Sequence, residues 1–243
     1  MPNLEKIGGK PVRSASQVER RFTCLLYGAS GVGKTTLAAS SSEVSSMSPV
    51  LFLDIEDGQE AVKDLYHVDS VRTTNIHELQ KIYEELRRGS TGYNTVVVDN
   101  VTELQQHGMA DIMDETDEWV DPEVPGWPTY QRSTEQMRRF VRGFRDLQMN
   151  VIFTAHVTTE ENERTKKERY RPYLTKKVSE QIPGFVNQVL YMFVQGKEDR
   201  IVQTVTTDSV VAKDRSRKLP ETIKSPNMQT VWDYMEDKQH GQG

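Results

Sequence analysis

Residues 22–40 read FTCLLYGASGVGKTTLAAS, and this stretch decides the fold. Its first part, FTCLLYG (22–28), is a short apolar run typical of a buried β-strand. GASGVGKT (28–35) matches the G-x-x-x-x-G-K-[ST] pattern of a phosphate-binding loop, and a helix is expected from about Gly33 to Ser42. A strand, a glycine-rich loop and a helix in this order predict the first unit of an α/β nucleotide-binding fold.

The residue types of this loop explain how it would hold a triphosphate. Glycines let the backbone turn and bring its N–H groups close to phosphate oxygens, and the following helix adds the positive end of its dipole. Lys34 can reach the β and γ phosphates, and the hydroxyl of Thr35 can bind Mg²⁺. A chance glycine-rich loop is the alternative, and the flanking strand and helix argue against it. We therefore expect ATP and Mg²⁺ as cofactors, held by Gly28, Ala29, Ser30, Gly31, Val32, Gly33, Lys34, Thr35 and Thr36.

Apolar runs and amphipathic stretches alternate along the rest of the chain. Short continuous apolar runs predict buried parallel strands, and apolar residues at helical spacing predict helices that pack against them. The runs 188–196 and 200–213 are expected to pair antiparallel at one edge of the sheet. Strands are expected at 22–28, 50–56, 70–74, 95–100 and 150–157, and helices at 75–89, 101–120 and 130–147.

This alternation predicts one α/β domain with a mostly parallel sheet, helices on both faces and antiparallel edge strands. The domain is expected over residues 22–235, between a polar lead-in at 1–21 and a flexible tail at 236–243. Cys24 is the only cysteine, and no apolar stretch approaches the length of a bilayer span. A reducing compartment, the cytoplasm, is therefore expected, with no membrane partner.

Asp99 ends the expected strand TVVVD (95–99). Because the carboxyl ends of parallel strands line the ligand crevice of an open α/β sheet, Asp99 is expected to hold Mg²⁺ together with Thr35. The alternative is an aspartate that only caps a buried strand.

A second acidic strand end, VLFLDIEDG (50–58), supplies the candidate catalytic carboxylate. Strand alternation places Asp54 and Glu56 on one face and Asp57 on the other. Glu56 lies nearest the expected strand end, where it would position or polarise water, although a solvated acidic turn is the alternative. His156 ends NVIFTAH and would sense the γ-phosphate, and a structural histidine is the other interpretation.

Five motifs in order resemble the RecA-like ATPases, and more narrowly the small phage-encoded members associated with single-strand annealing and recombination. They are FTCLLYGASGVGKTTLA, VLFLDIEDG, NTVVVDNVTEL, NVIFTAH and VVAKDRSRKLP, spread over about residues 20–220. The resemblance implies a RecA-like core, a catalytic glutamate at Glu56 and a γ-phosphate sensor, usually glutamine, at His156. It also implies that Lys213 and Arg215 act on the nucleotide of a neighbouring subunit in a ring or filament. A solvated basic turn is the alternative for that pair.

Charge is unevenly distributed despite the net charge of −5. Residues 111–123 carry seven acids and no base, whereas residues 164–177 carry seven bases and one acid. The resemblance places single-stranded DNA on the segment 158–177, expected to be a mobile loop or hairpin arm, although the acids at 160–163 favour a solvated face. The expected DNA-binding residues are Arg164, Lys166, Lys167, Arg169, Tyr170, Arg171, Tyr173, Lys176 and Lys177.

The expected function is Mg²⁺-dependent ATP hydrolysis on single-stranded DNA, in phage recombination or strand annealing in the host cytoplasm. A homo-oligomer is the expected state, and a single-strand-binding protein is a further candidate partner. The acidic segment 111–123 favours a second hypothesis, a regulatory or packaging NTPase whose target is a protein. A P-loop kinase acting on a small molecule is the third. Trp127, at a loop-to-helix junction, is expected to pack the loop onto the body, with a subunit contact as the alternative.

Overall fold

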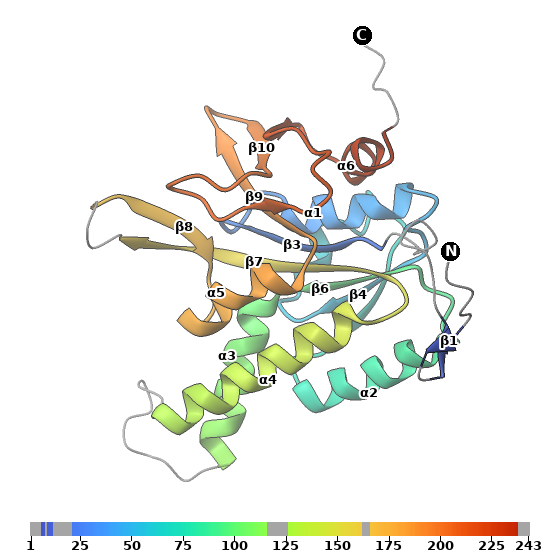
Figure 1. Ribbon diagram of the computed structural model, residues 1–243, viewed down its shortest axis with the longest axis vertical. Helices are drawn as coiled ribbons and strands as arrows, with labels where there is room; N and C mark the ends of the chain where they lie inside the picture. The colour runs from blue at the N-terminus through green and yellow to red at the C-terminus, as the bar shows by residue number, and fades with distance from the viewer. Residues whose placement is uncertain (1–5, 8, 12–20, 116–125, 162–165, 238–243) are drawn as a thin grey trace.

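The computed structural model of the chain describes residues 6–7, 9–11, 21–115, 126–161 and 166–237. Within them the centre is a ten-stranded sheet in the order β12-β10-β9-β3-β7-β6-β4-β5, with β8 paired to β7 and β11 paired to β9 (Figure 1). A separate antiparallel pair is formed by β1 (Lys6–Ile7) and β2 (Lys10–Pro11). The strands of the large sheet are β3 (Thr23–Gly28), β4 (Val50–Asp54), β5 (Asp69–Arg72), β6 (Thr95–Asp99), β7 (Asn150–Glu161), β8 (Glu168–Pro172), β9 (Gln188–Gln195), β10 (Asp199–Gln203), β11 (Lys213–Asp214) and β12 (Thr222–Lys224).

Six neighbouring strands, from β9 across to β5, run parallel and form the core of the sheet. Every residue of β3 is buried, including Cys24, and burial raises the pKa of that thiol above its usual range. The register pairs Gly28 with His156 and Asp54 with Asp99. The carboxyl ends of β3, β4 and β6 therefore lie at the same edge of the parallel core as His156, beyond which β7 continues to Glu161.

Helices cover both faces of the sheet, so two apolar cores form (Figure 1). Leu25 and Tyr27 of β3 face the core beneath α2, α3, α4 and α5, whereas Cys24 and Leu26 face the core beneath α1 and α6. Continuous apolar strands are the expected composition for a sheet buried on both sides. The helices are α1 (Lys34–Ala39), α2 (Ile76–Arg88), α3 (Val101–Glu115), α4 (Trp127–Arg145), α5 (Lys176–Phe185) and α6 (Met228–Met235), and short 3₁₀ helices span Ser40–Glu43 and Gly58–Ala61.

Local chemistry explains where α2 begins and ends. The Asn75 side chain accepts hydrogen bonds from the backbone N–H groups of His77 and Glu78, which is the preferred way to cap a helix N-terminus. Gly89 follows the last turn with a φ of 74°, a conformation that glycine adopts without strain. This helix matches the one predicted at 75–89.

The predicted fold class is confirmed, and so is the hairpin arm expected within 158–177. In that arm β7 extends to Glu161 and pairs antiparallel with β8, and α5 begins at Lys176. One local prediction is wrong. The expected strand 200–213 ends at Gln203, because the buried Thr204 hydroxyl donates to the Pro220 carbonyl and the chain then turns away. The helix expected at 101–120 is present as α3 over Val101–Glu115, and residues 116–120 lie outside the described ones.

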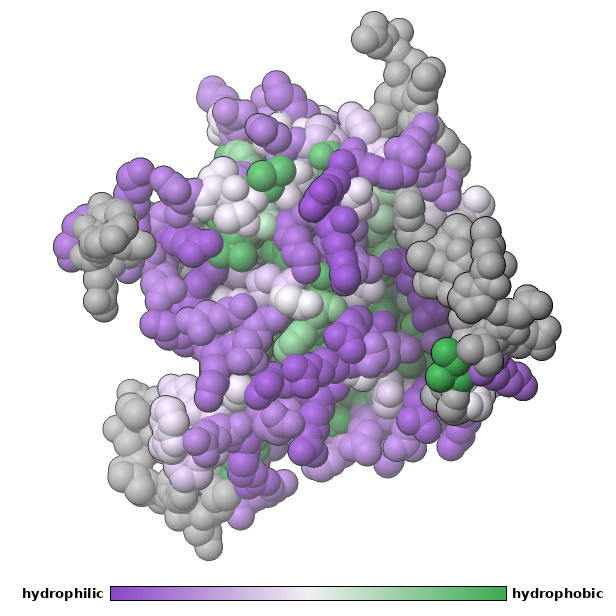
Figure 2. Space-filling model, viewed as in Figure 1, coloured by the Kyte–Doolittle hydropathy of each residue, from purple (hydrophilic) through white to green (hydrophobic). Residues whose placement is uncertain are grey.

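The surface is mostly polar. Figure 2 shows hydrophilic residues over most of one face, with hydrophobic residues visible in small areas between them. None of the helices in the described part of the chain is long and apolar enough to cross a membrane.

Gly28, at the end of β3, leads to a prediction about stability. A Cβ atom at this position would lie 2.2 Å from the Met192 carbonyl oxygen on β9, so Gly28→Ala forces two core strands apart. We expect Gly28→Ala to lower the free energy of unfolding by about 1 to 3 kcal/mol. Urea unfolding measures this change.

Gly184 in α5 provides the matched control. A Cβ atom there meets no atom within 4 Å, and alanine favours a helix. Gly184→Ala should therefore leave the stability equal or slightly higher. Equal stability of both variants would contradict the close contact at Gly28.

Candidate nucleotide site

The glycine-rich loop joins β3 to α1 and forms a curved backbone. Gly31 has a φ of 72° and Gly33 a φ of 108°, values at which a side chain would be strained. The Lys34 ammonium lies inside this curve and donates to the carbonyl oxygens of Gly28 at 3.1 Å and Ala29 at 2.9 Å. The loop therefore has the shape that the motif predicts, with a cation at its centre.

Electrostatics place Lys34 beside the acidic strand ends. Lys34 is buried, and this burial lowers the pKa of its ammonium. The carboxylates of Asp99 and Glu56 act in the opposite direction. Lys34, Glu56 and Asp99 are far apart in the sequence, but they lie in the same site of the folded chain.

Thr35 and Asp99 are brought together as predicted. The Thr35 hydroxyl donates to Asp99 Oδ2 at 2.6 Å, and the buried Thr154 hydroxyl donates to Asp99 Oδ1. Gly58 borders the pair, since a Cβ atom on it would lie 3.7 Å from Asp99 Oδ2 and 3.8 Å from Thr35 Oγ1. A hydroxyl and a carboxylate oxygen at the rim of a phosphate-binding loop are the donors that Mg²⁺ takes in nucleotide sites.

The rest of the magnesium coordination would come from the nucleotide and from water. Within the described residues, no group of three or more His, Cys, Asp or Glu side chains could hold a metal ion. Mg²⁺ in proteins is typically bound by one or two carboxylates together with phosphate oxygens. Thr35 and Asp99 fit that pattern.

Glu56, Asn100 and His156 form a polar cluster beside the loop. Asn100 Nδ2 donates to Glu56 Oε2 and lies 3.3 Å from His156 Nε2. His156 Nε2 is also 3.3 Å from Glu56 Oε1 and 4.0 Å from Glu103 Oε1. The two candidate catalytic side chains predicted from the sequence are therefore in contact.

The predicted pairing of Asp54 with Glu56 on one strand face is wrong, because β4 ends at Asp54. Asp54 is buried, which raises the pKa of its carboxyl group, and its Oδ1 accepts a hydrogen bond from the Gly58 backbone N–H at 3.1 Å. Asp54 thus supports the loop that follows β4, whereas the Glu56 side chain is 45% exposed and reaches the cluster.

Lys213 does not project toward a neighbour, in contrast to the sequence expectation. Its ammonium donates to the carbonyl oxygens of Pro183 at 2.7 Å and Val186 at 2.9 Å, at the C-terminal end of α5. A cation there satisfies carbonyl groups that a helix end leaves without partners. Arg215 is exposed, and no ion pair to another described residue is formed by its side chain. Its role in a neighbouring site stays a prediction.

Four of the basic residues in the segment 164–177 form ion pairs with acidic residues. Arg171 and Lys176 pair with Glu160 at 3.0 and 3.5 Å, and Lys166 pairs with Glu161 at 2.9 Å. Lys167 and Tyr170, which were also expected to bind DNA, contact other residues of the chain. Arg164 lies outside the described residues. Lys167 pairs with Asp208 at 3.4 Å, and the Tyr170 ring stacks on Tyr191 with a centroid distance of 5.5 Å. Arg169, Tyr173 and Lys177 are exposed.

Sequence reasoning missed three residues that shape the site. Asn100 directly follows Asp99, and Thr154 lies two residues before His156 on the same strand. Both residues therefore belong to motifs that the sequence analysis had identified, NTVVVDNVTEL and NVIFTAH. Arg200 had no such signal: its Nε donates to the Val32 carbonyl at 3.1 Å from β10 and supports the outside of the glycine-rich loop.

A family model for the AAA domain matches residues 20–216, which include the glycine-rich loop, Glu56, Asp99, His156 and Arg215. The chain belongs to this family. A search of curated proteins gives no match. The AAA domain described here is a P-loop ATPase with a nucleotide-binding site at the carboxyl edge of its sheet, which confirms the coarser part of the sequence prediction.

The different surroundings of Lys213 and Arg215 lead to opposite expectations for stability. Lys213→Ala removes two charge-assisted hydrogen bonds and should lower the free energy of unfolding by about 1 to 2 kcal/mol. Arg215→Ala, at an exposed side chain, should change it by less than about 0.5 kcal/mol. Thermal and urea unfolding of both variants measure these changes. A variant Arg215→Ala that is less stable than Lys213→Ala would contradict the prediction.

Proposed function

We propose that this AAA domain is a Mg²⁺-dependent ATPase that acts on single-stranded DNA, in phage recombination or strand annealing. The support for hydrolysis is the nucleotide site, and the support for DNA is a groove beside it. The groove lies between α3, α4 and the start of α5, and its volume is about 1140 Å³.

The side chains of the site have distinct parts in hydrolysis. Lys34 would leave the carbonyls of Gly28 and Ala29 and pair with the phosphates. Thr35 and Asp99 would hold Mg²⁺, which neutralises phosphate charge when it is bound. Glu56 would orient and polarise the attacking water, and His156 beside it would contact the γ-phosphate.

Exposed aromatic rings on the groove are the observation that carries the DNA proposal. Trp127 is 71% exposed, Tyr173 49% and Tyr130 39%, although rings of this size are ordinarily buried. Single-stranded nucleic acids bind proteins by stacking bases on such rings while basic side chains contact the phosphates. The sequence predicted that Trp127 packs the loop onto the body; the loop residues 121–125 lie outside the described ones, and the Trp127 side chain itself is exposed. The cations that line the groove are Arg138, Lys176 and Lys177, beside Glu135 and Glu180.

Hydrogen bonds join the groove to the nucleotide site. The Tyr173 backbone N–H donates to the His156 carbonyl at 2.8 Å, and the His156 N–H donates to the Thr102 hydroxyl at 3.0 Å. That hydroxyl in turn donates to the Tyr173 carbonyl at 2.9 Å. A strand bound against Tyr173 would therefore act on the backbone of His156, which supports a turnover rate that depends on DNA.

ATP turnover with and without single-stranded DNA tests this function. We expect DNA to raise the rate, and Lys34→Ala to abolish hydrolysis in both conditions because the phosphates lose their cation. Absence of DNA binding at low salt, with and without nucleotide, would contradict the proposal.

Trp127→Ala provides the residue-level measurement. Loss of one stacked base costs about 1 to 3 kcal/mol, so we expect the dissociation constant for single-stranded DNA to rise about fivefold to a hundredfold. Val71→Ala, an exposed apolar side chain on the edge strand β5, is the control and should bind DNA as the wild type does. Fluorescence anisotropy with a labelled oligonucleotide measures both.

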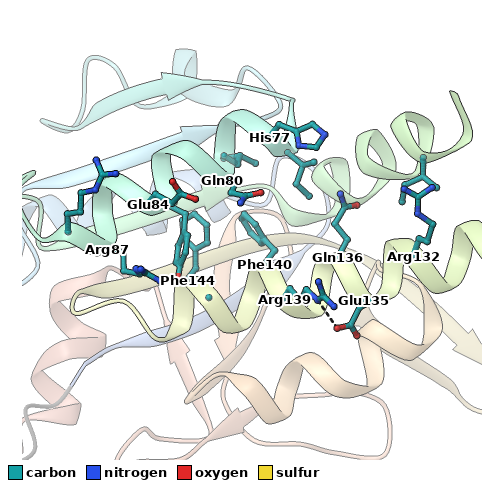
Figure 3. Close-up of a pocket in the computed structure, with 16 residues that line it drawn as sticks. His77, Gln80, Glu84, Arg87, Arg132, Glu135, Gln136, Arg139, Phe140 and Phe144 are labelled. Atoms are coloured by element: carbon teal, nitrogen blue, oxygen red, sulfur yellow. Dashed lines mark hydrogen bonds and ion pairs between the residues drawn. The ribbon is translucent and has the colours of Figure 1, made fainter. Parts of the chain in front are cut away.

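A second candidate function, an NTPase whose target is a protein, is favoured by a groove between α2 and α4. Figure 3 shows this groove, of about 800 Å³, with Phe140 and Phe144 between the helices and arginines along it. The arginines that line it are Arg87, Arg88, Arg132 and Arg139, beside Glu84 and Glu135. An aromatic floor with a basic rim fits an acidic peptide.

The double variant Arg87→Glu/Arg88→Glu separates the two candidates. If DNA is the target, stimulation of ATP turnover by single-stranded DNA should remain within about twofold of the wild type, because these arginines lie outside the DNA groove. A protein-stimulated ATPase that ignores DNA and loses its stimulation in this double variant would favour the second function.

A further inference from the structure

Asn100 is the first residue after β6, and it is completely buried. Its side-chain Oδ1 accepts a hydrogen bond from the Glu103 backbone N–H at 2.9 Å, and its carbonyl accepts one from Leu104 at 3.2 Å. These bonds cap the first turn of α3. Because Oδ1 is used by the helix, the orientation of the amide group is fixed.

The other end of this amide lies between the two candidate catalytic side chains. Nδ2 donates to Glu56 Oε2 and lies 3.3 Å from His156 Nε2. An asparagine amide carries two N–H donors, so one can serve the carboxylate while the other faces the imidazole. Asn100 therefore connects the start of α3 to Glu56 and His156 at once.

Glu56 needs such a contact because the strand does not hold it. β4 ends at Asp54, and the Glu56 side chain is 45% exposed. A glutamate at such a position has three rotatable bonds and loses this freedom only where a partner holds its carboxylate. Within the described residues, the contacts of the Glu56 carboxylate run to Asn100 and His156.

We propose that Asn100 is a positioning residue for ATP hydrolysis, whose amide holds the Glu56 carboxylate in the orientation that activates water. This inference rests on the proposed function, in which Glu56 polarises water. Asn100 itself touches neither the phosphates nor the water in this scheme. Its effect on the rate passes through Glu56, and misplacing a catalytic group by about 1 Å can cost on the order of a hundredfold in rate.

Asn100→Ser separates positioning from helix capping. Serine is as good a cap as asparagine, so α3 should stay intact, but its hydroxyl is too short to cap the helix and hold Glu56 at once. We expect kcat for basal ATP turnover to fall about tenfold or more, while the dissociation constant for ATP and the melting temperature stay near wild-type values. A merely structural role would leave kcat within twofold of the wild type, and that result would overturn the proposal.

Asn100→Asp is the second variant, because it keeps both the cap and the side-chain volume. Its carboxylate has no N–H to donate and would repel Glu56, so kcat should fall here as well. If Asn100→Ser fails to fold, the kcat of Asn100→Asp tests the proposal instead. A wild-type kcat in Asn100→Asp would overturn the proposal.

A double-variant cycle with Glu56→Gln tests whether Asn100 acts through Glu56. Once the carboxylate is gone, adding Asn100→Ser should lower the residual rate by less than twofold, because two residues that act as one unit are not additive. An equal loss in both backgrounds would overturn the proposal. Basal turnover needs no DNA, so this result is independent of DNA stimulation. A wild-type chain without any ATP turnover would overturn the proposed function and this inference together.

Discussion

The pairing register of the parallel strands is the constraint on which the site depends. In a parallel pair the register fixes which residues end the strands side by side, and a shift by one residue would turn every side chain to the opposite face. Here the register places Gly28 beside His156 and Asp54 beside Asp99. Two apolar cores hold this register from both faces of the sheet. The positions of His156 and Asp99 in the site follow from it.

Much of the fold and part of the site could be predicted from the sequence, for physical reasons that differ between residues. Lys34, Thr35 and Asp99 belong to short motifs whose backbone geometry is local, and the strand ends then bring them together. Asn100 and Arg200 were missed because their contacts depend on side-chain direction across the sheet, which strand periodicity does not determine. The ion pair between Arg171 and Glu160 was not predicted for a related reason, since it depends on the β7–β8 pairing that brings these two residues close.

Membership of the AAA domain family explains the site more fully than it explains the biological role. A phosphate-binding loop with its acidic partners binds and hydrolyses nucleotides, and proteins with different biological functions use this same site. Two further features lie outside the loop, the aromatic groove between α3, α4 and α5 and the arginine-lined groove between α2 and α4. Both grooves adjoin α4, whose Glu135 lines each of them.

Because Cys24 is buried, its reaction with a thiol reagent can be used to detect opening of the protein core. The thiol is in the central strand, and it is the only one in the chain. A thiol reagent reacts with the thiolate, which burial disfavours, so labelling requires that the core between β3 and the helices α1 and α6 open. The rate of labelling would therefore measure how often this core opens, and the effect of bound nucleotide on that rate would report how strongly the ligand holds it closed.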